Sequence, residues 1–216
     1  MYDLKTQTER LKRDYSLSDQ HIILSVGRLA KRKGILEFIR YAMPIITRAV
    51  PDTVFVVAGG NPTDALAHKE DMHSLIEAEV AKQGSETHVR LMGRVDQHTL
   101  IELYHLCDLF VLPAIPVVGD MEGFGIVVIE AGAAGKPVVA TRVGGIVDAV
   151  EDGRSGILVE PGDYHALASE IISLLRDPER RQQMGAYGRR RAQEQFDWDV
   201  IGKRHIELFS EVVARQ

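Results

Sequence analysis

Residues 21–34 read His-Ile-Ile-Leu-Ser-Val-Gly-Arg-Leu-Ala-Lys-Arg-Lys-Gly, and the order of residue types in this stretch decides the fold. The first six residues form a short apolar run that ends at Gly27, and a stretch with helical spacing follows at about residues 36–50. A short buried strand, a turn that contains glycine and a helix together form the repeating unit of a parallel sheet.

The same alternation of strand and helix patterns repeats along the chain. Further short apolar runs predict strands at residues 53–58, 88–92, 109–112, 137–140 and 156–159. Helical spacing predicts helices at residues 71–83, 97–107, 146–150 and 164–175, and a further helix that begins near Gly125. Because short buried strands separated by helices form parallel sheets with right-handed crossovers, we predict an α/β fold with a doubly wound, Rossmann-like sheet.

The ends of the chain differ from this middle part. Residues 1–20 are expected to form a polar lead-in or linker with one amphipathic helix, and residues 21–177 the Rossmann-like domain. After residue 177 the strand patterns cease, and two helices are predicted at residues 179–195 and 197–214. We expect the segment 178–216 to pack on the domain, with Arg189, Arg190 and Arg191 on a solvated helix face.

Composition excludes several classes of function. Of 216 residues, 45% are hydrophobic and 26% are charged, and the net charge of −5 gives no pull toward nucleic acid. Cys107 is the only cysteine, and no pair of histidines or cysteines has the spacing of a metal site. The absence of a Gly-x-Gly-x-x-Gly after the first strand disfavours a nicotinamide or flavin site. We expect a soluble, cytoplasmic chain without a signal peptide or a membrane span.

Two carboxylates bracket the segment Glu122-Gly-Phe-Gly-Ile-Val-Val-Ile-Glu130. A helix that starts near Gly125 places Glu130 about one and a half turns in, among apolar neighbours three and four positions away. This spacing predicts that Glu130 does not belong to a solvated face and needs a partner, for which the vicinal hydroxyls of a sugar would serve. The alternative is a surface glutamate on a short amphipathic helix.

Cations follow the first strand, and glycines precede the helix near residue 125. The planar guanidinium of Arg28 and the compact charge of Lys33 suit a diphosphate, whereas Lys31 and Arg32 are expected to solvate a helix start. Glycine on both sides of Phe124 favours close approach of an anionic ligand to the main chain at a helix N-terminus. The alternative for Phe124 is a side chain that plugs the core.

The carboxyl ends of parallel strands meet at one edge of the sheet, where open α/β sheets bind their ligands. Four loops of this chain start there, at residues 27–34, 93–95, 113–124 and 141–145. The sequence therefore predicts one crevice that carries both cations and carboxylates, which suits a nucleotide diphosphate linked to a sugar.

These residues carry a resemblance to a known family. Three motifs, in this order, resemble the C-terminal, donor-binding domain of the group 1 (family 4) retaining glycosyltransferases, which have the two-domain GT-B fold. They are Gly27-Arg28-Leu29 with Lys33-Gly34, Glu122-Gly-Phe-Gly with Glu130, and Gly135-Lys-Pro-Val-Val-Ala-Thr with Gly144-Gly145. The resemblance runs from about His21 to the C-terminus.

The resemblance implies a role for each matching position. Arg28 and Lys33 would neutralise the departing diphosphate, Glu122 would contact the transferred sugar, and Glu130 would hold the ribose hydroxyls. The other residues expected to bind the donor are Gly27, Arg94, Val95, Gly123, Phe124, Gly125 and Ile126, with the main chain of Arg94 and Val95 at the base edge. The family implies a nucleotide sugar such as a UDP- or GDP-hexose as donor, and neither a cofactor nor a metal site.

The chain departs from the family in two ways. Many relatives carry a basic or aromatic residue before the Glu-Gly-Phe-Gly turn, whereas this chain has Asp120-Met121. A complete enzyme also has an N-terminal domain that supplies the acceptor site, and only about twenty residues precede the first strand here. We therefore expect the chain to bind a donor weakly and to need that domain, in cis or in trans, for transfer. Any peripheral membrane association would come only through that domain.

Other functions stay open from the sequence. The chain is either the donor half of a glycosyltransferase, a non-catalytic nucleotide-sugar-binding module, or part of another GT-B enzyme such as an epimerase.

Overall fold

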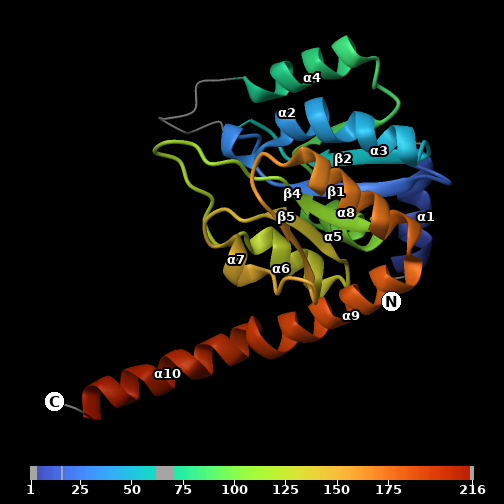
Figure 1. The fold of residues 1–216 in the computed structure, drawn as a ribbon. Helices are drawn as coiled ribbons and strands as arrows, with labels where there is room; N and C mark the ends of the chain where they lie inside the picture. The colour runs from blue at the N-terminus through green and yellow to red at the C-terminus, as the bar shows by residue number, and fades with distance from the viewer. Residues whose placement is uncertain (1–3, 16, 62–70, 215–216) are drawn as a thin grey trace.

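The computed structural model describes residues 4–15, 17–61 and 71–214 and contains a parallel sheet with helices on both faces (Figure 1). The sheet has six strands in the order β3-β2-β1-β4-β5-β6, and every neighbouring pair is parallel. The strands are β1 (His21–Val26), β2 (Thr53–Ala58), β3 (Val89–Gly93), β4 (Leu109–Leu112), β5 (Val138–Thr141) and β6 (Gly156–Val159). The predicted doubly wound, Rossmann-like fold is confirmed, and each predicted strand lies within one residue of an observed one.

Alternation of side chains along the strands builds two separate cores. Successive strand residues point to opposite faces of a sheet, so Ile23 joins one core while Ile22 and Leu24 join the other. Phe55 and Val56 on the neighbouring strand divide in the same way. Since both faces are covered, the strands other than the edge strand β3 are buried along almost their whole length, and this is why the sequence shows continuous apolar runs.

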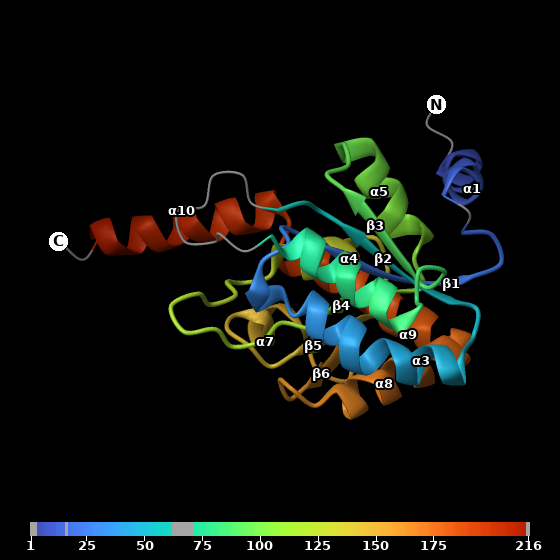
Figure 2. The ribbon, with the colours of Figure 1, turned by 90° about the horizontal axis from the view of Figure 1, so that it is seen from above.

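Helices supply the other half of each core. One face carries α2 (Ile35–Glu37), a π-helical turn (Phe38–Ala42), α3 (Met43–Ala49), α4 (Met72–Gln83) and α8 (Tyr164–Arg176). The opposite face carries α1 (Leu4–Asp14), α5 (Gln97–Leu106), α6 (Ile126–Ala133) and α7 (Ile146–Ala149). Figure 2 shows α3 and α4 lying side by side, away from α1 and α5.

Strands β1 to β3 form one half of the sheet and strands β4 to β6 form the other. The strand order therefore switches between β1 and β4, which are hydrogen-bonded neighbours at the centre of the sheet. After β1 the chain crosses to the face of α2, whereas after β4 it crosses to the face of α6. The two connecting loops, residues 27–34 and 113–125, therefore diverge from one point at the carboxyl edge of the sheet. Ligands of open α/β sheets bind at such a switch point.

Helix α9 (Pro178–Gln195) packs closely on α6, and glycines make this approach possible. A Cβ atom added at Gly188 would lie 3.4 Å from the Cα atom of Gly132, and one added at Gly185 would lie 2.0 Å from the carbonyl oxygen of Gly135. Arg189 donates to the Ala133 carbonyl at 3.0 Å, just beyond these glycines.

The predicted solvated face of three arginines needs correction. Arg189 is exposed, but it donates to the end of α6, and Arg191 donates to the carbonyls of Asp148 and Ala149 at the end of α7. Arg190 lies over the Tyr187 ring, with the guanidinium carbon 5.1 Å from the ring centroid. Cations favour helix C-termini, where carbonyl groups lack partners within the helix, so two of these arginines tie α9 to the domain.

Helix α10 (Trp198–Ala214) extends away from the rest of the molecule (Figure 1; Figure 2). None of its residues is buried, and large apolar side chains are exposed along it: Trp198, Ile206, Leu208, Phe209, Val212 and Val213. The expectation that both C-terminal helices pack on the domain is therefore wrong for α10. The apolar residues of α10 have helical spacing, but this pattern does not indicate which surface they pack against. Among residues 4–15, 17–61 and 71–214, no helix has the length and apolar character to cross a membrane.

The glycine contact between α9 and residue 135 can be tested with two helical glycines that differ only in surroundings. Gly185→Ala should lower the free energy of unfolding by about 1–3 kcal/mol, because the new methyl group overlaps a backbone carbonyl that cannot rotate away. Gly202→Ala in α10 meets nothing within 4 Å and should cause no loss. Urea unfolding followed by circular dichroism measures both, and equal stability of the two variants would contradict the packing described.

Candidate functional site

The loop after β1 lies directly against the loops after β2 and β4. A Cβ atom at Gly59 would come within 1.8 Å of the Gly27 carbonyl oxygen, and one at Gly34 within 1.9 Å of the Pro113 carbonyl oxygen. Gly27, Gly34 and Gly59 also have positive φ angles of 142°, 66° and 147°, which disfavour any other residue. The rim of the sheet is thus built from main chain packed on main chain.

Glu122 lies buried between these loops and has two cationic partners. Its carboxylate accepts from Lys33 Nζ at 2.9 Å and from Arg32 Nε at 3.2 Å, and Arg32 also donates to Asp120 at 3.1 Å. The Lys33 side chain reaches Glu122 past Gly27, where an added Cβ would lie 3.3 Å from Lys33 Cε. Lys33 and Glu122, two of the predicted catalytic residues, are therefore in direct contact at the switch point.

The burial of Arg32 corrects a sequence prediction. Lys31 is exposed as expected, but Arg32 is only 9% exposed and does not solvate a helix start. The three residues Lys31–Lys33 form a 3₁₀ turn, in which successive side chains point in different directions around the axis. The turn directs Arg32 and Lys33 inward, where they bind acidic residues some ninety positions further along the chain.

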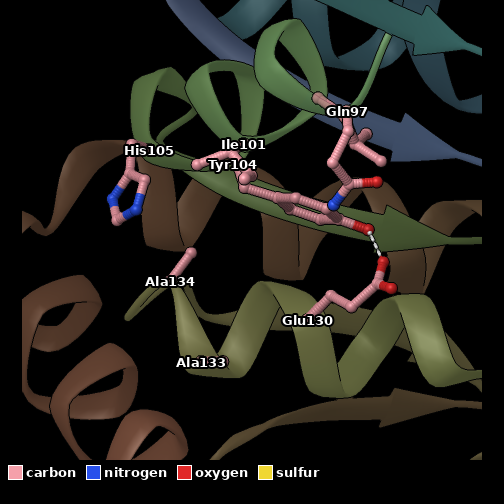
Figure 3. A pocket seen from close by; sticks show the side chains of 8 residues that line it. Gln97, Ile101, Tyr104, His105, Glu130, Ala133 and Ala134 are labelled. Atoms are coloured by element: carbon pink, nitrogen blue, oxygen red, sulfur yellow. Dashed lines mark hydrogen bonds between the residues drawn. The ribbon is translucent and has the colours of Figure 1, made fainter. Parts of the chain in front are cut away.

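The carboxylate of Glu130 is in a different environment from that of Glu122. Glu130 lies on α6 and is exposed, so the prediction that it avoids a solvated face is wrong. It does have a partner: Tyr104 Oη on α5 donates to Glu130 Oε2 at 2.6 Å (Figure 3). Burial, and then the hydrogen bond and charge of Glu130, raise the pKa of Tyr104, so its phenol stays protonated and donates.

A pocket of about 270 Å³ separates α5 from α6 around this hydrogen bond. Figure 3 shows the Tyr104 ring lying along the pocket with its hydroxyl toward Glu130, while His105 stands at the other end. The pocket is lined by Gln97, Leu100, Ile101, Tyr104, His105, Glu130, Ala133 and Ala134. The helix predicted at residues 97–107 contains Tyr104, but helical spacing alone does not indicate which partner its hydroxyl has.

The Glu-Gly-Phe-Gly turn leads from the buried carboxylate into α6. Gly125 has a left-handed φ of 73° and caps the helix, and the Gly145 amide donates to the Gly123 carbonyl at 3.0 Å. Phe124 does not plug the core: it is 39% exposed and packs on Phe196, with ring centroids 5.5 Å apart. The turn therefore leaves the N-terminus of α6, with its favourable field for anions, at the rim of the sheet.

The remaining predicted site residues lie on the same rim. Arg28 follows β1 and Arg94 follows β3, and both side chains are exposed. Val95 is half-buried against the core below α5, and Ile126 at the start of α6 is 68% exposed. The parallel sheet thus collects every predicted site residue at its carboxyl edge or on α6. Within the described ranges, which omit 1–3, 16, 62–70 and 215–216, no cluster of acidic, histidine or cysteine side chains could hold a metal ion.

Comparison with known proteins assigns the family. Residues 7–191 match the model of the family described as glycosyl transferases group 1. The chain belongs to this family. It is 34% identical over 203 residues to a GDP-mannose-dependent alpha-(1-6)-phosphatidylinositol monomannoside mannosyltransferase of Mycolicibacterium smegmatis, covering 93% of this chain and 50% of the relative. It is 32% identical over 188 residues to a glycogen synthase of Mycobacterium tuberculosis, covering 87% and 42%.

Solved structures agree on the fold. HepE of Anabaena, in complex with UDP, matches 97% of this chain and 56% of its own with a TM-score of 0.81 at 23% identity. Sucrose-phosphate synthase of Thermosynechococcus elongatus matches 100% of this chain and 52% of its own with a TM-score of 0.76 at 28% identity. The C-terminal domain of a group 1 glycosyl transferase (LpcC) of Francisella tularensis is covered completely, with a TM-score of 0.74 at 24% identity. This glycosyltransferase chain has the fold of a GT-B C-terminal domain and spans about half the length of the curated relatives it matches.

The opposite environments of the two glutamates predict opposite effects on stability. Glu122→Ala should lower the free energy of unfolding by about 3 kcal/mol or more, because it leaves two buried cations without their shared carboxylate. Glu130→Ala removes an exposed carboxylate and should cost at most about 1 kcal/mol, because the Tyr104 hydroxyl keeps the Val127 carbonyl as an acceptor and lines an open pocket. Urea unfolding of the two glycosyltransferase variants measures the difference, and a Glu130→Ala variant less stable than Glu122→Ala would contradict it.

Proposed function

We propose that this chain is the donor-binding half of a retaining glycosyltransferase that transfers a hexosyl group from a nucleotide diphosphate sugar to a hydroxyl acceptor. The observation that carries the proposal is the pairing of Lys33 with Glu122 at the switch point, next to an exposed Glu130 on the helix that follows. Relatives named for GDP-mannose, and a structural neighbour solved with UDP and UDP-glucose, support a UDP- or GDP-hexose as donor.

In this proposal the diphosphate lies over the loop after β1. Lys33 and Arg28 would meet its charge, and Lys33 would stabilise the charge that develops as the bond between the sugar C1 and the phosphate oxygen breaks. The N-terminus of α6 adds a favourable field at the same rim. We propose that these cations, rather than a metal ion or another cofactor, neutralise the negative charge of the departing diphosphate.

Glu130 would hold the ribose and Glu122 the transferred sugar. An exposed carboxylate can accept from two vicinal hydroxyls, which matches Glu130, and the main chain of Arg94 and Val95 would pair with the base edge. Glu122 already accepts from two cations, so its role is to position the sugar rather than to attack it. The acceptor oxygen would bond to C1 on the face that the diphosphate leaves, and the departing phosphate would take the acceptor proton.

A second half would supply the acceptor site, in cis or in trans. The coverage of about half of each curated relative supports this, since a closed cleft is what orients both reactants. Any contact with a membrane would come through that second half. We propose that the donor site lies in the cytoplasm, where it would bind nucleotide sugars.

The donor site can be tested by ligand-dependent stabilisation. UDP, GDP and their hexoses should raise the melting temperature of the chain, since ligand at ten times its Kd contributes about 1.4 kcal/mol. Lys33→Ala and Glu130→Ala should each abolish the shift while the fold survives. Lys31→Ala, an exposed cation two residues from Lys33, is the matched control and should keep it. A full shift in both site variants would show that the nucleotide binds elsewhere.

Catalysis by the pair of halves makes a separate prediction. Sugar transfer from the preferred donor should be negligible with this chain alone and should appear when an N-terminal GT-B domain is supplied, fused or as a separate chain. Release of nucleoside diphosphate with a lipid or sugar acceptor measures it. Transfer by the chain alone would contradict the need for a second half, and binding without transfer in every combination would favour a non-catalytic binding module.

A further inference from the structure

We infer that Tyr104 is a positioning residue, which sets the Glu130 carboxylate to accept from both ribose hydroxyls and so makes the site select ribonucleotides over 2′-deoxynucleotides. This inference rests on the donor site proposed above and assigns a residue that the sequence motifs do not include. Its basis is the hydrogen bond of 2.6 Å from Tyr104 Oη to Glu130 Oε2, inside the pocket between α5 and α6.

The donor of this hydrogen bond is held rigidly. Tyr104 is only 5% exposed, and its ring packs on Phe110 of β4 with centroids 5.9 Å apart. The hydroxyl also lies 3.4 Å from the Val127 carbonyl, one turn before Glu130 on α6. A buried ring fixed to the sheet therefore presents its O–H at one place beside an exposed, otherwise flexible carboxylate.

The acceptor has the capacity that two hydroxyls require. A carboxylate offers two oxygens with about four acceptor positions, and Tyr104 occupies one of them on Oε2. An exposed glutamate samples many rotamers and loses that freedom when a ligand orders it. Because Tyr104 already restricts the Glu130 side chain, less conformational entropy is lost when the ligand binds. Both carboxylate oxygens also keep a fixed direction toward the two ribose hydroxyls.

Other polar groups in the pocket do not replace Tyr104 in this role. Figure 3 shows His105 at the opposite end of the pocket from Glu130. Burial, and then the charges of Lys136 and Arg189, lower the pKa of His105, so the imidazole is neutral at pH 7 and offers Glu130 no cation. Gln97 lines the same end as Glu130, but in the described part of the chain no hydrogen bond joins the two side chains.

The test compares ribonucleotides with 2′-deoxynucleotides. Isothermal titration of the chain with UDP, GDP, 2′-deoxy-UDP and 2′-deoxy-GDP gives the ratio of Kd values for each base. The wild-type chain should prefer the ribonucleotide by roughly tenfold, since a hydrogen bond to a charged group is lost in the deoxy form. Tyr104→Phe keeps the ring and should reduce that ratio several-fold, mainly by weakening the ribonucleotide.

Two further variants separate positioning from packing. In a Glu130→Ala background, titrated at millimolar nucleotide so that the weak residual binding is measured, the preference for ribonucleotides should be lost. Adding Tyr104→Phe there should change nothing more, because Tyr104 acts through Glu130. Tyr187→Phe removes a hydrogen bond of the same 2.6 Å length, to Glu151 on another side of the domain, and should leave every Kd unchanged. Circular dichroism and melting temperature verify that each variant is folded.

The outcomes distinguish this inference from the proposed function. Equal weakening of ribo- and deoxynucleotides by Tyr104→Phe, or an effect that persists without Glu130, would overturn the positioning role and leave the donor site standing. Failure of all four nucleotides to bind the wild-type chain, or binding that ignores Glu130→Ala, would overturn the donor site itself.

Discussion

Glu122 carries a carboxylate into the region between two loops where little water can reach it, and an uncompensated charge there would cost several kcal/mol. The loop after β1 meets this cost with Lys33 and Arg32, which lie within 3.2 Å of the two carboxylate oxygens. Because these loops leave the sheet in opposite directions at the switch point, the ion pairs join the two halves of the fold. The close main-chain packing at Gly27 and Gly34 brings the cations within reach.

Glu122 and Glu130 are only eight positions apart, but the first carboxylate is buried and the second is exposed. Glu122 lies in the loop after β4 at the carboxyl edge of the sheet, whereas Glu130 follows a left-handed Gly125 that turns the chain into α6. The first is held by cations in the interior, and the second by the neutral hydroxyl of Tyr104 at an open pocket. A carboxylate that keeps its acceptor positions toward solvent is suited to a ligand, while one already paired is suited to hold a shape.

Most of the fold could be predicted from the sequence because strand burial and helix spacing are local properties. The strands at His21–Val26 and Thr53–Ala58, and the collection of loops at one sheet edge, needed no long-range information. Partners distant in sequence escaped prediction: Arg32 finds Asp120 and Glu122 about ninety residues away, and Glu130 faces Tyr104 from another helix. A run of three cations is commonly solvated, so no local pattern could separate Arg32 from Lys31.

The departure at Asp120 becomes understandable from the same ion pairs. A diphosphate bound as proposed would attract Lys33 away from Glu122. A buried Glu122 carboxylate without a cationic partner would lower the stability of the fold. Arg32 prevents this, since it holds the other carboxylate oxygen and is itself held by Asp120. A basic residue at position 120 would repel Arg32 and compete with it for Glu122. Asp120 and Arg32 therefore function as a matched pair, which keeps Glu122 compensated whether Lys33 binds the protein or the ligand.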